Sequence, residues 1–255
     1  MDMSGSQGMH SPVAQFEITP LIELSVGGYD LSFTNSSLFM ALAIFISAAF
    51  LMSAMRFGEL VPGRMQGLAE MMYEFVADMV RSNVGHEGRP YFPFIFTLFV
   101  FLLFGNMLGL IPYSYTFTSQ IIVTFAMAAF VFVGVTLIAL FKHGLHFFSF
   151  FVPDGAPKVL IPFLIVIEVI SYFVRPVSLS VRLFANMLAG HTMLKVFAGL
   201  AVMISSAGGL ALVGSVLPFL ALIGLTGLEV LVAALQAYVF TILTCMYLND
   251  ALHLH

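Results

Sequence analysis

Apolar residues fill long, nearly uninterrupted runs of this chain, and short polar stretches separate the runs. A helix needs about 20 mostly apolar residues to cross the roughly 30 Å hydrocarbon core of a bilayer. The runs come close to this length or exceed it, so the pattern predicts an all-α polytopic membrane protein. Its five predicted spans lie at about residues 38–55, 91–111, 120–141, 159–204 and 210–248.

The segment between the first two spans follows a different pattern. From Arg64 to Arg81 the apolar residues recur every three or four positions, while Glu70, Glu74 and Asp78 line the other side. This period predicts an amphipathic surface helix at about residues 64–81. We expect its apolar face to pack on the protein's own membrane helices or on lipid headgroups, and a dedicated partner site is the alternative.

The last two apolar runs are too long to stand upright in a bilayer. At about 1.5 Å per residue, 159–204 and 210–248 would form straight helices of roughly 69 and 58 Å, about twice the hydrocarbon core. They must therefore be broken, strongly tilted or nearly flat. Pro176 is a possible kink in the first run. The Gly208-Gly209 pair predicts a turn between the runs, so the two should form a hairpin.

Composition agrees with a membrane protein and excludes other classes. The chain is 60% apolar, only 9% charged and has a mean hydropathy of +1.05, whereas soluble domains carry about 25% charged residues. The net charge of −4 argues against a nucleic-acid partner. The single cysteine, Cys245, cannot form an intrachain disulfide. Nothing in the sequence implies a metal or a cofactor, and we predict neither.

The basic residues indicate how the chain crosses the membrane. Arginines gather between the first and second predicted spans, whereas the first 36 residues contain acidic side chains and no Lys or Arg. By the positive-inside rule, the N-terminus is then outside and the C-terminus, after five crossings, is inside. We divide the chain into an outside-facing tail, residues 1–36, and one membrane domain, residues 37–255. The arginines are Arg56, Arg64, Arg81 and Arg89.

Polar residues within the penultimate run are regularly spaced. They follow one another at steps of three or four, which places them along one stripe of a helix. Arg182 is the most informative of them, because a bare Arg near the bilayer centre costs about 2.5 to 3.5 kcal/mol on insertion scales and is rare without a function. The stripe consists of Glu168, Ser171, Arg175, Ser178, Arg182 and Asn186.

The final run supplies a second polar face with Glu229 and Gln236. In an antiparallel hairpin, residues at equal depth lie equally far from the turn. The midpoints of His191 with Glu229, and of Arg182 with Gln236, both fall at or beside the glycine pair. This predicts two facing layers, Arg182 with Gln236 deep inside and His191 with Glu229 nearer the outside. Glu168 should lie on the inner side of Arg182.

These layers have the chemistry of a proton path interrupted by a fixed cation. Carboxylate, imidazole, hydroxyl and amide groups relay protons through water, whereas Arg, with a pKa above about 12, releases none. Structural alternatives are open for several residues. Glu168 and Arg175 could form an ion pair that only locks the helix, and His191 could be a satisfied buried histidine. Ser171 and Ser178 could bond their own helix carbonyls.

Three segments carry a family resemblance. They are Phe104–Gln120, Ser178–Leu194 with the pattern R-L-x-x-N-x-x-A-G-H, and Leu228–Leu248. They resemble subunit a of the F-type ATP synthases, and the resemblance covers nearly the whole chain after the tail. It implies five spans plus a surface helix, with the last two spans steeply tilted along a rotating ring of c subunits. It also implies the function of a proton-translocating stator subunit with two offset half-channels.

The resemblance assigns roles to individual residues. Arg182 matches the essential arginine that faces the ring, and Gln236 matches the glutamine beside it. Asn186 matches an asparagine one turn on, and Glu168 with Ser171 match polar residues of the inner half-channel. Ser178, His191 and Glu229 complete the expected proton path, and Arg175 and Asn106 are secondary candidates.

The sequence departs from many bacterial relatives at the outer layer. Those relatives have Glu where His191 stands and His where Glu229 stands. The order found here resembles mitochondrial and alphaproteobacterial versions. Gly109 also stands where some relatives carry an acid.

The resemblance further implies partners and a location. We expect the c-subunit ring, b-type subunits of a peripheral stalk, the rest of the ATP synthase and membrane lipid as partners. The expected location is a bacterial inner membrane, with the mitochondrial inner membrane as the alternative. A secondary proton-coupled transporter is the competing class, but its repeated halves are not found in the sequence. A purely structural subunit of a respiratory complex would not need the polar stripe.

Overall fold

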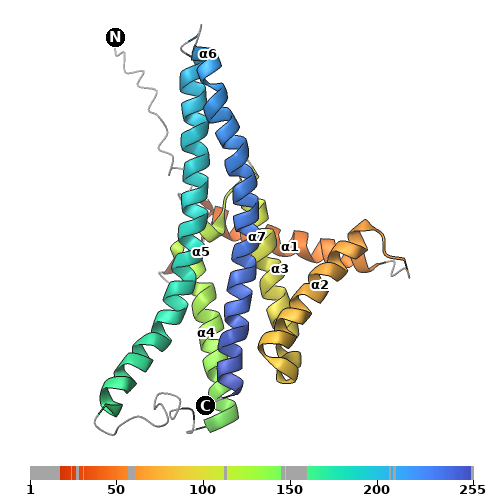
Figure 1. Ribbon diagram of the computed structural model, residues 1–255, viewed down its shortest axis with the longest axis vertical. Helices are drawn as coiled ribbons and strands as arrows, with labels where there is room; N and C mark the ends of the chain where they lie inside the picture. Colours follow the sequence, from red (N-terminus) through yellow and green to blue (C-terminus); the bar gives the residue numbers. More distant parts are fainter. Residues whose placement is uncertain are drawn as a thin grey trace.

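The computed structural model describes residues 18–23, 25–26, 29–30, 32–56, 61–111, 114–144, 147, 160–206, 208 and 211–253. Nearly all of this described chain is helical (Figure 1). The helices are α1 (Asn35–Met55), α2 (Arg64–Asn83), η2 (Gly85–Tyr91), α3 (Phe92–Gly109), η3 (Phe117–Ser119), α4 (Ile121–His143), α5 (Ile161–Ser206), α6 (Ala211–Gly214) and α7 (Val216–Leu252).

Five helical segments are long and apolar enough to cross a membrane, which confirms the five predicted spans. They are residues 35–55, 85–109, 121–143, 161–206 and 216–252. The second span includes η2, whose Pro90 and positive-φ Gly85 join α2 to α3 in a tight 3₁₀ segment. Gly85 has φ of +77°, a conformation that residues with a Cβ rarely adopt.

Short strands were not expected but occur before α1. Pro20–Ile22 (β1) pairs antiparallel with Phe33–Thr34 (β4), and Ser25–Val26 (β2) pairs with Tyr29–Asp30 (β3). Thr34 ends this segment and caps α1, because its side chain accepts a hydrogen bond from the Ser37 backbone N–H. The first 17 residues of the predicted tail lie outside the described residues.

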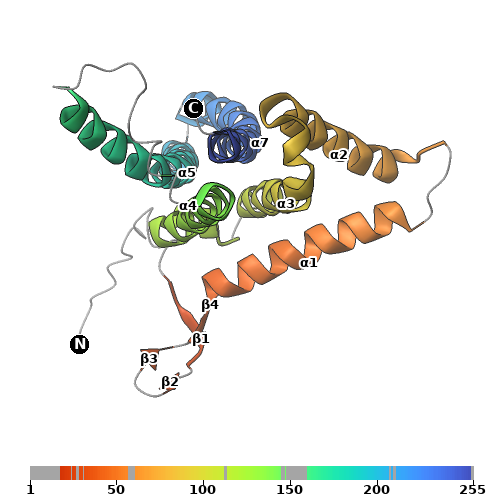
Figure 2. The ribbon, with the colours of Figure 1, turned by 90° about the horizontal axis from the view of Figure 1, so that it is seen from below.

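The helices form layers around the long α5–α7 pair. Figure 2 shows α3 and α4 between this pair and α1, which lies on the far side. In Figure 1, α1 runs across the long axis of the α5–α7 pair. The two directions cannot both stand upright in one bilayer. If α1 crosses the membrane, α5 and α7 must lie at a steep tilt.

The length of α5 leads to the same conclusion. Its 46 residues form one helix of about 69 Å, more than twice the hydrocarbon thickness. Pro176 lies inside this helix and has no N–H for the Tyr172 carbonyl. The predicted kink does not end the helix, although the N-terminal part of α5 diverges from α7 (Figure 1). The predicted turn follows at Gly208, where φ is +68°.

The amphipathic helix α2 confirms the predicted surface segment. Val76, Met79 and Val80 are buried in the main core cluster, whereas Glu70 and Glu74 are exposed. Ala69, in its N-terminal half, is also buried, although other apolar residues near its start remain exposed. The helix therefore packs against α1, α3 and α7 and leaves part of its apolar surface uncovered.

Glycines let the segment after α3 pack closely against that helix. A Cβ at Gly105 would lie 2.4 Å from Cζ of Phe117, and a Cβ at Gly109 would lie 2.4 Å from Oγ1 of Thr116. Both contacts are shorter than real Cβ contacts, so only glycine fits without a shift. The two glycines are four positions apart on one face of α3, a spacing that allows close packing in membranes. They bring the 114–120 segment against the long hairpin.

Basic residues at the C-terminal end of α4 contact the C-terminal carbonyls of α7. Lys142 donates from Nζ to the Leu252 carbonyl at 3.2 Å, and His143 Nε2 lies 3.2 Å from the Ala251 carbonyl. These are among the last carbonyls of α7, which lack partners within their own helix. Lys142 also forms an ion pair with Glu87 of η2. One end of the bundle is thus held by charge as well as by packing.

Candidate functional site

His191 and Glu229 meet between α5 and α7, which confirms that they face each other as predicted; their place toward the outside stays a prediction. His191 Nδ1 lies 2.9 Å from Glu229 Oε1, and both residues are buried, at 7% and 5% exposed. Neither carboxylate oxygen has an aligned hydrogen-bond donor in the described chain, so the contact is a close approach of the two groups, and it is an ion pair only when the imidazole carries a second proton. A buried carboxylate in this setting needs its histidine or a proton, because an unpaired buried charge is costly.

Gly190 makes room for this pair. A Cβ at this position would lie 2.7 Å from Glu229 Oε1 and 3.1 Å from its Cδ. The glycine next to His191 therefore lets the α7 carboxylate reach across the helix interface. This packing gives a physical reason for Gly before His in the sequence motif.

Thr116 binds the other nitrogen of the same imidazole. Its Oγ1 lies 2.8 Å from His191 Nε2, and the same hydroxyl donates to the Gly109 carbonyl at 3.1 Å. Both nitrogens of His191 are therefore engaged, one by a carboxylate and one by a hydroxyl. The histidine connects three parts of the chain: α5, α7 and the segment after α3.

Asn106 lies in the same buried region but has its partners within the chain. It is fully buried, and its Nδ2 donates to the Ala233 carbonyl of α7 at 3.2 Å. Its Oδ1 accepts from Thr118 Oγ1 at 2.9 Å. The amide thus ties α3 to α7 and to the 114–120 segment. Asn106 therefore holds together the elements that carry Thr116 and Glu229.

Arg182 lies about two and a half turns from His191 along α5 and is exposed. Its guanidinium forms no hydrogen bond or ion pair with any residue that the structure describes. The next residue, Leu183, is buried at 1% exposed, so the helix turns its apolar side inward and its arginine outward. The cation is therefore available to a group outside this chain.

Other residues of the α5 stripe are exposed as Arg182 is, namely Ser171, Ser178 and Asn186.

Gln236 of α7 differs, since it is only 8% exposed. No hydrogen bond joins Gln236 to Arg182 in the described chain, so their facing layer stays a prediction.

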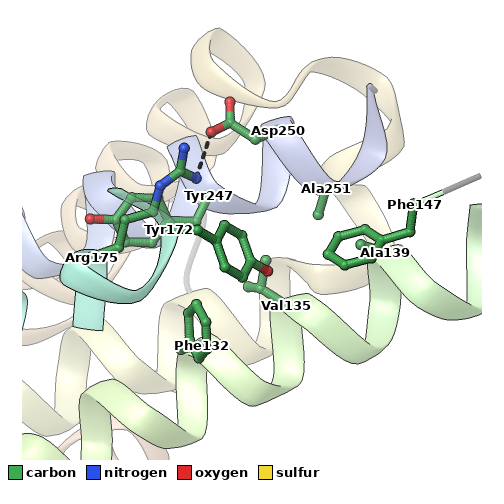
Figure 3. Close-up of a pocket in the computed structure, with 9 residues that line it drawn as sticks. All are labelled: Phe132, Val135, Ala139, Phe147, Tyr172, Arg175, Tyr247, Asp250 and Ala251. Atoms are coloured by element: carbon green, nitrogen blue, oxygen red, sulfur yellow. Dashed lines mark hydrogen bonds and ion pairs between the residues drawn. The ribbon is translucent and has the colours of Figure 1, made fainter. Parts of the chain in front are cut away.

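Arg175 has its partner on α7. Its Nη1 donates to Asp250 Oδ2 at 2.9 Å (Figure 3). The guanidinium carbon also lies 5.5 Å from the centre of the Tyr172 ring and 5.2 Å from that of Tyr247, within the range of cation–π attraction. The ion pair that locks this part of α5 thus uses Asp250, where the sequence had suggested Glu168.

The surroundings of Arg175 enclose a small cavity. The cavity has a volume of about 20 Å³ and lies among α4, α5 and α7 (Figure 3), room for about one water molecule. Tyr172 donates its hydroxyl proton to Thr136 at 2.7 Å, because the Thr136 hydroxyl donates to the Phe132 carbonyl. Glu168 is half-buried two turns before Arg175.

Sequence reasoning missed Thr116 and Asp250. The 114–120 segment is polar, but it has no period that would show which hydroxyl meets His191. Gly105 and Gly109 carried the available signal, because their spacing on α3 indicates close packing. For Asp250, the midpoint with Arg175 falls close to the hairpin turn. The argument that paired His191 with Glu229 could have found this pair as well.

Comparison with known proteins gives a consistent result. The family described as ATP synthase A chain matches residues 36–249. ATP synthase subunit a of Rhodospirillum rubrum is 58% identical over 247 residues, which is 97% of this chain and 100% of the relative. ATP synthase subunit a of Parvibaculum lavamentivorans is 55% identical over 242 residues, 95% of this chain and 93% of the relative. That of Mesorhizobium japonicum is 54% identical over 242 residues, 95% of this chain and 96% of the relative. With its long α5–α7 hairpin, its buried His–Glu pair and these relatives, the chain belongs to the ATP synthase A chain family.

Proposed function

We propose that this chain is the proton-translocating stator subunit of a rotary F-type ATP synthase. In this role it provides two offset half-channels to a ring of c subunits. The relatives are bacterial proteins named ATP synthase subunit a, and they match the chain over nearly its whole length. The proposal places the chain in a bacterial inner membrane as a multi-pass protein.

The exposed guanidinium of Arg182 carries the proposal. An arginine within a membrane helix must find an anionic or polar partner, because burial without one is expensive. The described chain gives Arg182 no ion pair, so we assign its partner to a carboxylate on another subunit. A ring carboxylate that passes α5 would meet this cation once in every passage.

The groups on either side of Arg182 form the two half-channels. On one side, His191 lies about 13 Å from Arg182 along α5, and with Glu229 of α7 it delivers protons from the outside. On the other side, Glu168, Ser171 and Ser178 lead toward the inside. Because Arg keeps its proton, it separates the two paths. Asn186 and Gln236 are proposed to order water beside the cation.

The attraction between Arg182 and a ring carboxylate has a strength that suits a brief contact. At an effective dielectric constant near 20 and about 4 Å, an Arg–carboxylate attraction is roughly 4 kcal/mol, equivalent to about three pK units. This favours release of the ring's proton without making a permanent pair. Each proton that crosses 100 mV contributes about 2.3 kcal/mol, so several must be combined for each ATP. A ring that carries several carboxylates satisfies that requirement.

The remaining partners and the orientation follow from the same role. Peripheral-stalk b-type subunits would hold this chain against the turning ring, and lipid would cover its outer helices. The N-terminal tail, residues 1–36, would face outside, and the C-terminus would face inside, as the arginines between the first two spans favour. The Arg175–Asp250 pair, near the C-terminus, would then lie on the inner side.

The Arg182→Ala variant tests the proposal in the intact complex. We expect assembly at wild-type level and complete loss of ATP-driven proton pumping, measured as acidification of inverted membrane vesicles. Gln236→Leu is the graded comparison and should slow pumping without abolishing it. Pumping by Arg182→Ala at near wild-type rates would remove the central role of this residue.

A further inference from the structure

The hydroxyl of Thr116 has two neighbours but only one proton. It lies 3.1 Å from the Gly109 carbonyl oxygen and 2.8 Å from His191 Nε2. A carbonyl oxygen can only accept, so the hydroxyl proton is used there. The hydroxyl oxygen can then only accept from the ring. His191 must therefore carry a hydrogen on Nε2.

The opposite nitrogen faces a buried carboxylate. His191 Nδ1 is 2.9 Å from Glu229 Oε1. If the ring were neutral and the carboxylate ionised, two lone pairs would face each other at this distance. One further proton removes the repulsion, on Nδ1 or on the carboxylate. The pair then has no net charge, which is the inexpensive condition for a buried site.

We propose that Thr116 fixes the tautomer of His191, so that the transported proton moves between Nδ1 and Glu229 alone. This inference rests on the proposed function of the pair in proton entry. In the transfer step the Nδ1–H bond breaks, its electron pair stays on nitrogen, and a new O–H bond forms on the carboxylate. The 2.9 Å separation is within the range in which such transfers occur. Because neither oxygen is aligned with a donor in the structure, the transfer also needs a rotation of the carboxylate or the ring that brings Nδ1–H onto Oε1. The Nε2 hydrogen stays on the ring throughout, held by Thr116, which makes Thr116 a positioning residue.

The residues around the His191–Glu229 pair offer Glu229 few other groups with which to exchange a proton. Gly190 sits against Oε1, and neither Glu229 oxygen has an aligned donor in the described chain. Asn106 and Thr118 are nearby polar residues of the same region, but they are bonded to each other. Nδ1 of His191 is therefore the proton partner that the described structure gives to Glu229.

Variants of Thr116 in the intact complex test this role. Thr116→Val keeps the shape and removes the hydroxyl, and we expect proton pumping per assembled complex to fall about tenfold, the scale of one lost buried hydrogen bond. Thr116→Ser keeps the hydroxyl and should remain within about twofold of wild type. Thr124→Val is the matched control, because that buried hydroxyl bonds only carbonyls of its own helix start, Gln120 and Ile121. Wild-type pumping by Thr116→Val, or equal loss in Thr116→Ser, would overturn the proposal.

A spectroscopic measurement needs no variant at position 116. In complex labelled with ¹⁵N-histidine, the difference between wild-type and His191→Gln solid-state NMR spectra isolates the two ring nitrogens of His191. We expect the spectra to show a hydrogen on Nε2, because the Thr116 hydroxyl accepts from it. An unprotonated Nε2 would overturn the role of Thr116 even if Thr116→Val failed to assemble. Wild-type pumping by His191→Gln would instead contradict the proposed function of the pair itself.

Discussion

Gly190 leaves the space that Glu229 occupies: a Cβ at this position would lie 2.7 Å from Glu229 Oε1. The carboxylate is buried, and His191 is the neighbour that balances it. The contact thus joins packing to chemistry, because the same glycine that permits close helix packing sets the position of the acid. Changes at Gly190 should therefore affect proton transfer before they affect folding.

The Gly190→Ala variant should lower ATP-driven proton pumping about tenfold. The added methyl group must push the carboxylate away from His191, and overpacking of this kind costs roughly 1 to 3 kcal/mol. Pumping per assembled complex in inverted vesicles is the measurement. Gly199→Ala, on the same helix and with nothing within 4 Å of its Cβ, is the control and should pump normally. Equal activity of the two variants would show that Glu229 has room to move.

How far the sequence predicts this site depends on periodicity. The α5 stripe and the hairpin turn are regular features, so the depth of His191 and Glu229 followed from their distance to Gly208. Thr116 lies in a segment without a helical period, and only tertiary packing against Gly109 brings it to the imidazole. Irregular segments carry no register, and their contacts therefore could not be predicted.

The fold shows the same division. Apolar run length predicted each span, and the excess length of the fourth run predicted a helix that is broken, strongly tilted or nearly flat. The sequence did not decide between a broken and a continuous helix at Pro176, because neighbouring helices determine whether a proline kink is tolerated. The strands of two or three residues before α1 are too short to give an alternating pattern.

Arg175 and Asp250 should be coupled in stability. Their contact is a charge-assisted hydrogen bond at 2.9 Å, but the side chains are 21% and 42% exposed, so solvent screening reduces its value to about 1 kcal/mol. We expect Arg175→Ala and Asp250→Ala each to lower the thermal midpoint of the purified complex. The double variant should be no less stable than the worse single variant, as for groups in direct contact. Additive losses would show that the two residues stabilise the protein separately.

Gly105→Ala should destabilise the protein by about 1 to 3 kcal/mol. Its Cβ would lie 2.4 Å from Cζ of Phe117, a ring that is 1% exposed and cannot move into solvent. The thermal midpoint of the complex is the measurement. Gly134→Ala is the control, because nothing lies within 4 Å of a Cβ there, and it should be neutral or slightly stabilising. A Gly105→Ala variant as stable as Gly134→Ala would mean that the 114–120 segment can move away from α3 at little cost in stability.

Exchange of His191 and Glu229 tests contact and function together. Either single change, His191→Glu or Glu229→His, puts two like groups at the 2.9 Å contact and should reduce proton pumping strongly, because like charges so close oppose ionisation. The double variant restores one acid and one imidazole in the same place.

The double exchange should pump substantially better than the worse single variant. Such non-additivity is expected only of residues that share a contact. Pumping per assembled complex is measured in inverted vesicles, with His191→Gln and Glu229→Gln as controls that remove each group without adding a like partner. The position of Thr116 adds a second expectation, since a carboxylate at position 191 can accept a hydrogen bond from that hydroxyl but cannot supply one. Recovery should therefore be partial. Strictly additive losses in the double variant would contradict the idea that these two residues act as one proton-carrying unit.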